Sequence, residues 1–356
     1  MKERESNIEL LRILAIIGVI VLHYNNPSIG GGLSYVVQGN LNFYILYFLE
    51  SLFICGVDLF ILISGFFMSY SLERKLWKPV ELIIQVMFFS LGKYILISIL
   101  QHEQITIIGV LVSLVPDNYF VILYCVVYVL SLYVNIIFDK LKEKSRIFVL
   151  ICFMIFSAYP TLIDFMSEIV GRQWNGLSSI GLYGSQWGYT SFNFLLMYII
   201  GAYMRRYNIR IKKFTTYKLM LLLLACNVIL VCWSRFNDFI GYFTEKSAWE
   251  YCNPVVILEA VIIFILFSRI RSKSIKMINI LAQGAFSVFL LHDLFIPYIG
   301  IEKIVVGNAA IMVIHILASS ILIYMVCWCI NFICNLLMRP IYRKLSKLFP
   351  YLIIND

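Results

Sequence analysis

Charged residues are scarce in this sequence. Asp, Glu, Lys and Arg make up only 14% of the 356 residues, whereas apolar residues make up 61%, and the mean hydropathy is +0.87. The core of a soluble protein of this length could not bury so much apolar surface. The composition therefore excludes a soluble globular protein and indicates an integral membrane protein.

Paired cysteines, linkers and repeats are missing as well. The nine cysteines lack the loop spacings of a disulfide framework or a zinc site and fall inside or at the edge of apolar stretches, so we expect reduced structural thiols and no metal. No polar linker, low-complexity tract or internal repeat divides the chain. The first apolar segment lacks a small-residue cleavage site and is expected to remain as a helix. We predict one integral membrane domain over residues 1–356, with a short basic tail from about residue 339.

Ten apolar stretches have the length that a membrane span needs. A hydrocarbon core about 30 Å thick takes roughly 20 apolar residues of α-helix. We place the spans at roughly residues 8–25, 44–70, 79–100, 119–138, 147–163, 187–204, 216–234, 252–268, 277–298 and 307–335. Residues 105–115 are too short to span and are expected to form a re-entrant or interfacial helix; if they span instead, the count changes. The predicted fold is an all-α, polytopic transmembrane bundle of about ten helices.

The basic residues divide unevenly between the two sides of this bundle. Of the 29 lysines and arginines, 22 fall in the N-terminal segment, the C-terminal tail and alternate connections, and only four (Arg172, Arg235, Lys246 and Lys303) fall in the opposite connections. The positive-inside rule then places both termini in the cytoplasm. Orientation thus accounts for the net charge of +9 without a nucleic-acid partner.

A few ionisable residues lie inside predicted spans. Each costs roughly 2.5–3.5 kcal/mol at mid-helix and therefore needs a partner, a watery cavity or a function. They are Arg12, His23, Asp58, Lys93, Glu259, His292, Asp293 and His315. We expect Lys93 to snorkel, Glu259 to pair with Arg12 or another cation, and His315 to be a packing residue, so these three stay outside the predicted site.

Arg12 and His23 share one face of the first predicted helix. Eleven residues correspond to three turns plus about 20°, and to an axial separation of about 16 Å. The pair indicates a polar passage, or else a snorkelling arginine and a boundary histidine. His292 lies at a depth similar to that of His23, and Asp58 needs a cation or a histidine nearby. We therefore expect the two histidines and Asp58 to face one cavity.

Three motifs in this order resemble the membrane-bound acyltransferase-3 family. The Arg12-to-His23 spacing is similar to the family's Arg-x10-His signature, GVDLFILISGFF resembles its VD-x-FF-x-x-SG-F element, and FSVFLLHDLFI resembles its late histidine element. The resemblance covers about residues 6–335. It implies a cell-membrane, multi-pass O-acyltransferase that moves an acetyl or similar group from cytoplasmic acyl-CoA to a surface glycan or a lipid-linked saccharide.

The resemblance also implies roles for the membrane-embedded residues. His23 would act as general base or carry the acyl group, and Asp58 would orient or charge-balance one histidine. His292 would be a reserve base, an electrophilic stabiliser or a structural residue. Arg12, Lys75 and Lys78 would bind the phosphates of acetyl-CoA, the co-substrate. Both lysines lie in the segment ERKLWKP, at a position where many relatives have a doubled arginine.

Aromatic residues in the connection at about residues 164–186 and just beyond it are candidates for binding the acceptor. Trp174, Tyr183 and Trp187 have the side chains that stack on sugars, although aromatic rings also form belts at the lipid headgroups. The alternative function is a membrane carrier or exporter of a glycan intermediate or small anion, because polar residues at mid-membrane also mark transport paths. The sequence shows neither the inverted repeats nor the broken helices in matching halves that favour a carrier.

Overall fold

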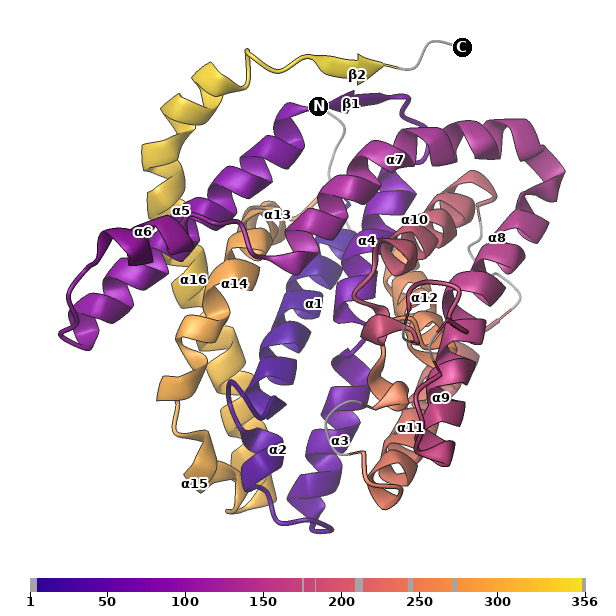
Figure 1. Cartoon of the computed structure of the whole chain (residues 1–356), viewed down its shortest axis with the longest axis horizontal. Helices are drawn as coiled ribbons and strands as arrows, with labels where there is room; N and C mark the ends of the chain where they lie inside the picture. The colour runs from indigo at the N-terminus through magenta and orange to yellow at the C-terminus, as the bar shows by residue number, and fades with distance from the viewer. Residues whose placement is uncertain are drawn as a thin grey trace.

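The computed structural model describes residues 5–174, 176–182, 184–208, 214–242, 246–270 and 274–353. Tyr183, one of the predicted acceptor-binding residues, lies outside these ranges. The described chain is a helical bundle with one two-stranded ribbon (Figure 1). The helices are α1 (Ser6–Asn25), α2 (Gly32–Tyr35), α3 (Leu41–Phe53), α4 (Gly56–Met68), α5 (Trp77–Leu100), α6 (Ile107–Ser113), α7 (Tyr119–Leu141), α8 (Ser145–Phe153), α9 (Tyr159–Val170), α10 (Ser191–Arg206), α11 (Thr216–Phe239), α12 (Pro254–Ser268), α13 (Lys276–Leu281), α14 (Ala285–Leu291), α15 (Ile301–Val305) and α16 (Ala309–Leu345).

The predicted all-α membrane fold is confirmed. In the described ranges, eight segments are long and apolar enough to cross a membrane. One of them, Tyr119–Val170, has 52 residues and turns back at Lys142–Lys144, so it supplies two crossings, by α7 and by α8 with α9 (Figure 1). Helix α10 has 16 residues, a length of about 24 Å, and supplies a tenth crossing in this part of the chain.

Several helix ends differ from the prediction for local reasons. Helix α10 begins at Ser191 rather than near 187, because the Thr190 side chain caps it by accepting from the Asn193 amide. Helix α16 continues through Pro340 to Leu345. The predicted ninth span is broken into α13, α14 and short 3₁₀ turns at Ala282–Gly284, His292–Leu294 and Ile296–Tyr298. The last predicted helical turns near residue 298 are therefore not α-helical.

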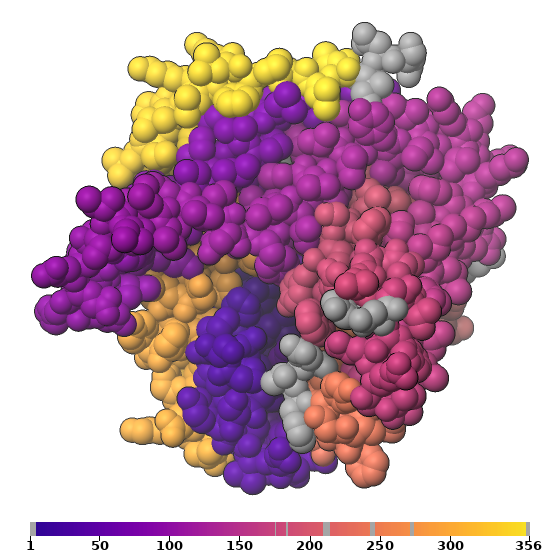
Figure 2. All heavy atoms as spheres, viewed as in Figure 1, coloured from indigo at the N-terminus to yellow at the C-terminus, as the bar shows by residue number. Residues whose placement is uncertain are grey.

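The short apolar stretch after α5 does not span. Helix α6 has seven residues and packs against α5, and both helices project from one side of the bundle (Figure 2). Ile107 and Ile108 on α6 are exposed. This exposure fits contact with lipid at the membrane interface, and the number of crossings stays at ten in the described ranges.

The basic connections gather at one end of the bundle. Strand β1 (Glu73–Lys75) pairs with β2 (Tyr351–Ile353) at the end where α7 turns into α8, whereas α2 and α15 lie at the opposite end (Figure 1). Arg74 of β1 is buried and donates to the Ser131 hydroxyl and to three backbone carbonyls. We call this end the basic end and the other the distal end.

Small residues bring α4 and α10 together at the centre of the bundle. A Cβ on Gly65 would overlap the carbonyl oxygen of Tyr198, and a Cβ on Gly201 would overlap that of Leu62. Glycine at both positions lets the two backbones touch, as small residues do in membrane helix packing. Gly65 thus serves helix packing, whereas Ser64 beside it lines a cavity.

Candidate active site

Two histidines from distant parts of the chain meet in the half of the bundle nearer its distal end. His23 lies on the last turns of α1, and His292 begins the 3₁₀ turn that ends α14. His292 Nε2 is 2.6 Å from His23 Nδ1, and the two rings stack with centroids 4.6 Å apart. The structure therefore brings together the two histidines that the sequence placed at similar depth.

The hydrogen bonds of this pair define where its protons lie. His292 Nδ1 is 3.1 Å from the carbonyl oxygen of Val288, which can only accept, so Nδ1 carries the proton. In neutral His292, Nε2 then has a lone pair and accepts from His23 Nδ1–H. It follows that His23 Nε2 is unprotonated, and this atom has no hydrogen-bond partner among the described residues. His23 is thus oriented as a base.

The pair opens onto a cavity of about 210 Å³. Its polar walls include Lys93, Asp293, Glu50 and the phenol rings of three tyrosines, Tyr119, Tyr189 and Tyr251. The sequence predicted that Lys93 would snorkel to the membrane surface, but in the structure its side chain forms an ion pair with Asp293 instead. Its ammonium lies 2.8 Å from both carboxylate oxygens of Asp293. Lys93 therefore belongs to the site, because its pairing partner adjoins His292.

Asp58 does not reach either histidine. It is fully buried, one carboxylate oxygen accepts from Asn193 Nδ2 at 3.0 Å, and the other has no partner in the described part of the chain. Asp58 is absent from the cavity lining. The acidic residue that the structure places beside the histidines is Asp293, on the helix end that already carries His292.

A second cavity of about 210 Å³ lies toward the basic end. It is lined by Arg12 and Lys78, by the polar groups of Ser64 and Gln283, and by apolar side chains. Arg12 pairs with Glu9 at 2.9 Å rather than with Glu259, whose carboxylate oxygens have no partner in the described ranges. Lys75 is not in this lining; its ammonium lies over the ring of Tyr351, 5.9 Å from the centroid.

We call the cavity beside His23 and His292 the histidine cavity, and the one lined by Arg12 and Lys78 the basic cavity. The two cavities are adjacent. Val19, Val57 and Phe289 line both of them. Val19 lies on α1 between Arg12 and His23, so one helix face runs from the cations to the base, as the eleven-residue spacing predicted. The arrangement suits a long ligand with an anionic end and a reactive end.

A larger cavity of about 450 Å³ lies beyond the histidine cavity. Trp174 and Trp187, two of the predicted aromatic residues, line it together with Asp164, Glu168, Glu250, Gln173 and Gln186. Tyr189 lines both this cavity and the histidine cavity. Burial raises the pKa of Tyr189 above its ordinary value, so its hydroxyl remains a hydrogen-bond donor. We call this space the aromatic cavity.

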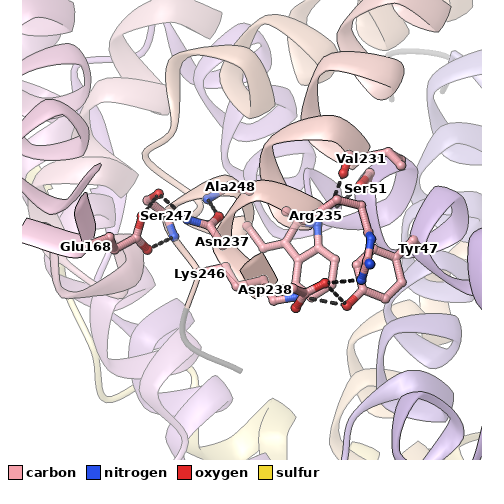
Figure 3. A network of polar contacts seen from close by, with 12 residues as sticks. Tyr47, Ser51, Glu168, Val231, Arg235, Asn237, Asp238, Lys246, Ser247 and Ala248 are labelled. Atoms are coloured by element: carbon pink, nitrogen blue, oxygen red, sulfur yellow. Dashed lines mark hydrogen bonds and ion pairs between the residues drawn. The ribbon is translucent and has the colours of Figure 1, made fainter. Parts of the chain in front are cut away.

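A buried polar network (Figure 3) holds the segment that precedes Glu250, which lines the aromatic cavity, and Tyr251, which lines the histidine cavity. The Lys246 ammonium is 2.6 Å from Asp238 and donates to the Tyr47 hydroxyl at 2.9 Å. Burial lowers the pKa of Lys246, while Asp238 acts in the opposite direction. On the other side of the segment, Glu168 accepts from the Ser247 amide at 2.7 Å. These contacts fix the chain just before Glu250 and Tyr251.

Sequence reasoning missed the three carboxylates of the aromatic cavity, and it missed Tyr119 and Tyr251 of the histidine cavity. Membrane depth alone singled out Lys93 and Asp293 but could not show that they pair across helices. His315, in contrast, accepts from the Tyr24 hydroxyl or donates to it at 3.2 Å and contacts the carbonyl of Ile299, which confirms it as a packing residue. In the described residues, no cluster of three or more His, Cys, Asp or Glu could hold a metal ion.

The family model of acyltransferase 3, described as an acyltransferase domain, matches residues 5–332. The match covers the three cavities described above and every described residue named above except those of the C-terminal tail. Comparison with curated proteins and with solved structures gives no match.

Proposed function

Because this chain belongs to the acyltransferase 3 family and is a multi-pass membrane acyltransferase, we propose that it transfers an acetyl group from cytoplasmic acetyl-CoA to a glycan hydroxyl. The acceptor is a surface glycan or a lipid-linked saccharide on the opposite side of the membrane. The proposal places the basic end in the cytoplasm, in agreement with the positive-inside rule.

One observation carries this proposal: the bonding of His292 leaves His23 Nε2 with a free lone pair at the cavity wall. A neutral imidazole held by a second residue is the usual form of a general base near pH 7. His292 acts here as the residue that orients the base. Its own Nδ1 is occupied by the Val288 carbonyl, so it does not compete for the substrate proton.

The reaction then follows from the positions of these groups. The acceptor hydroxyl gives its proton to His23 Nε2 as its oxygen attacks the thioester carbonyl carbon. The carbon–sulfur bond breaks, the coenzyme leaves as a thiolate, and the His23 imidazolium returns the proton to that sulfur. The products are the acetyl ester and free coenzyme A. His23 keeps its Nδ1–H bond to His292 throughout.

The basic cavity is the proposed donor site. Arg12 and Lys78 supply positive charge for the phosphates of the coenzyme, and the apolar walls suit its extended arm. Because Val19 and Phe289 line both cavities, the two spaces adjoin, and the thioester extends from the basic cavity to the histidine cavity. Lys75 lies outside this lining, so we assign the phosphate contacts to Arg12 and Lys78 alone.

The aromatic cavity is the proposed acceptor site. Trp174 and Trp187 offer ring faces for stacking on a sugar, and the amides and carboxylates offer hydrogen bonds to its hydroxyls. Because Tyr189 lines both cavities, a sugar stacked there has a direct route to His23.

The experiment that tests the function uses membrane vesicles that contain the full-length protein, labelled acetyl-CoA and surface glycan from cells lacking it. We expect label to enter the glycan as an alkali-labile ester. Vesicles with His23→Ala at an equal protein level provide the control. Equal incorporation by both would contradict the proposed role of His23, and no incorporation by either would contradict the proposed donor or acceptor.

A further inference from the structure

The chain after α16 returns to the loop that carries Lys78. We call residues 347–353 the C-terminal segment; they lie across the basic end of the bundle (Figure 2). Strand β2 of this segment pairs antiparallel with β1, which ends three residues before Lys78 (Figure 1). The Leu76 amide also donates to the carbonyl of Pro350 at 3.2 Å. Backbone hydrogen bonds therefore tie the C-terminal segment to the start of α5.

Aromatic packing strengthens this connection at Trp77, the residue directly before Lys78. The ring centroid of Trp77 lies 5.5 Å from that of Phe349 and 5.8 Å from that of Tyr342, near the end of α16. Only 6% of Trp77 is exposed, although it is the first residue of α5. Rings at such distances attract one another in addition to the effect of burial. The C-terminal part of the chain thus encloses the residue that precedes Lys78.

Helix α5 has few other contacts that could fix its start. Of its most apolar stretch, 22% is buried in the structure, a lower share than in any other of the eight candidate spans. Lys78 pairs with Glu81 at 3.4 Å, but Glu81 lies on the same helix, so this pair cannot place α5 relative to the bundle. Helix α7 holds the loop from the other side, because the Tyr128 hydroxyl donates to the carbonyl of Lys75 at 3.3 Å. The loop is therefore fixed between α7 and the C-terminal segment.

The position of this loop affects the basic cavity, because Lys78 and Arg12 supply the two cations of its lining. Arg12 comes from α1, the most deeply buried of the candidate spans, at 72%. Lys78 comes from α5, the least buried one. The separation of the two cations therefore depends on where α5 begins, and a ligand that contacts both cations is sensitive to a small displacement.

We infer that the C-terminal segment is a positioning element of the donor site: it holds Trp77 and thereby places Lys78 opposite Arg12 for the phosphates of the coenzyme. The inference rests on the proposed donor site and extends it beyond residue 332, where the family match ends. The segment acts through its strand pairing and through Phe349, so its own charges are not required.

The first test removes the segment and measures acetyl transfer in membrane vesicles at equal protein level. Deletion of residues 347–356 should raise the apparent KM for acetyl-CoA by about tenfold, as Lys78→Ala does, with kcat and the acceptor KM unchanged. Phe349→Ala should raise it about threefold because one aromatic pair is lost, whereas Phe349→Tyr keeps the ring and the wild-type KM. Leu348→Ala, at a 74% exposed position beside Phe349, is the matched control.

The outcomes of this test separate the inference from the proposed function. Intact transfer with an unchanged KM for acetyl-CoA after the deletion would overturn the inference alone. A loss in kcat without a change in KM would also overturn it, because the segment would then support the fold rather than the donor site. No transfer by the unmodified protein would contradict the proposed function itself.

The second test asks whether the segment acts through Lys78. The deletion combined with Lys78→Ala should raise the KM for acetyl-CoA no further than Lys78→Ala alone, because a misplaced loop costs nothing once its cation is gone. Multiplied effects of the two changes would overturn the inference. If the deleted protein does not accumulate in the membrane, Phe349→Ala takes its place in this comparison.

A charge control completes the design. Lys344 and Lys347 are exposed, and Lys344→Gln with Lys347→Gln leaves Phe349 and strand β2 in the chain. This double variant should keep the wild-type KM for acetyl-CoA. A tenfold rise would show that these cations contact the coenzyme directly, which would replace the inferred positioning role.

Discussion

The ammonium of Lys93 in α5 and the carboxylate of Asp293 form an ion pair at 2.8 Å, directly beside His292. The pair links α5 to the turn that presents His292, and both residues line the histidine cavity. With side chains 23% and 42% exposed, the pair is too accessible to water to contribute much to overall stability. Its consequence is local: it restrains the turn that orients the base.

Breaking this pair should lower activity more than stability. We expect Lys93→Met and Asp293→Asn each to reduce acetyl transfer by about tenfold to a hundredfold, because a misplaced orienting residue shifts the base. The charge-exchanged double variant, Lys93→Asp with Asp293→Lys, should recover part of the activity. The initial rates of acetyl transfer per unit of inserted protein are compared among these variants, with Lys303→Met at an exposed position as control. Equal rates in all variants would show that the pair does not position His292.

His23→Ala should abolish transfer while the protein remains inserted and abundant. Loss of a general base typically costs about 10²-fold or more in rate. His315→Ala is the matched control, because it removes a membrane histidine that contacts Tyr24 and a backbone carbonyl outside the cavity. Moving the base by one position, as His23→Leu with Leu22→His, turns it about 100° away and should not restore activity. Substantial transfer by His23→Ala would assign the chemistry elsewhere or favour a carrier.

The donor site gives a prediction with an internal control. Arg12→Lys and Lys78→Ala should each raise the apparent KM for acetyl-CoA by about tenfold with little change in kcat, because a phosphate contact far from the reacting carbon contributes uniform binding. Lys75→Ala removes an equal charge from the same segment, but outside the cavity lining, and should behave like the wild type. A larger effect for Lys75 than for Lys78 would place the phosphates on the β1 side of the loop.

The orientation of the bundle can be measured directly. Since basic residues gather at the end that carries β1 and β2, a reporter fused after Asp356 should be active only if it requires the cytoplasm. A fusion within the connection between α15 and α16 provides the opposite control. Activity of an exterior-dependent reporter at Asp356 would reverse the sides of the donor and acceptor cavities.

The contact between α4 and α10 predicts a stability change. Gly201→Ala should lower the free energy of unfolding by about 1–3 kcal/mol, because its methyl group would overlap the Leu62 carbonyl. Gly92→Ala in α5 is the control, since nothing lies within 4 Å of the added Cβ. Thermal unfolding in detergent measures both. An unchanged melting temperature for Gly201→Ala would mean that the two helices can separate without loss.

The sequence by itself determined the membrane class, the number and order of the crossings and the gathering of basic residues on alternate connections. These properties depend on the composition and length of contiguous stretches, because the bilayer selects each helix largely by its own hydrophobicity. The alignment of Arg12 with His23 was equally readable, since both lie on one regular helix and its 3.6-residue period fixes their common face.

Only the tertiary structure decided which charged residues meet. The His23–His292 bond joins residues 269 positions apart, and the Lys93–Asp293 pair joins residues 200 positions apart. Asp58, which the sequence paired with a histidine, binds Asn193 instead, and Lys93 enters the site. Such pairings depend on how helices rotate and pack against one another. That packing follows from contacts such as those of Gly65 and Gly201. The partners of these glycines are backbone atoms of distant segments, which no local sequence pattern encodes.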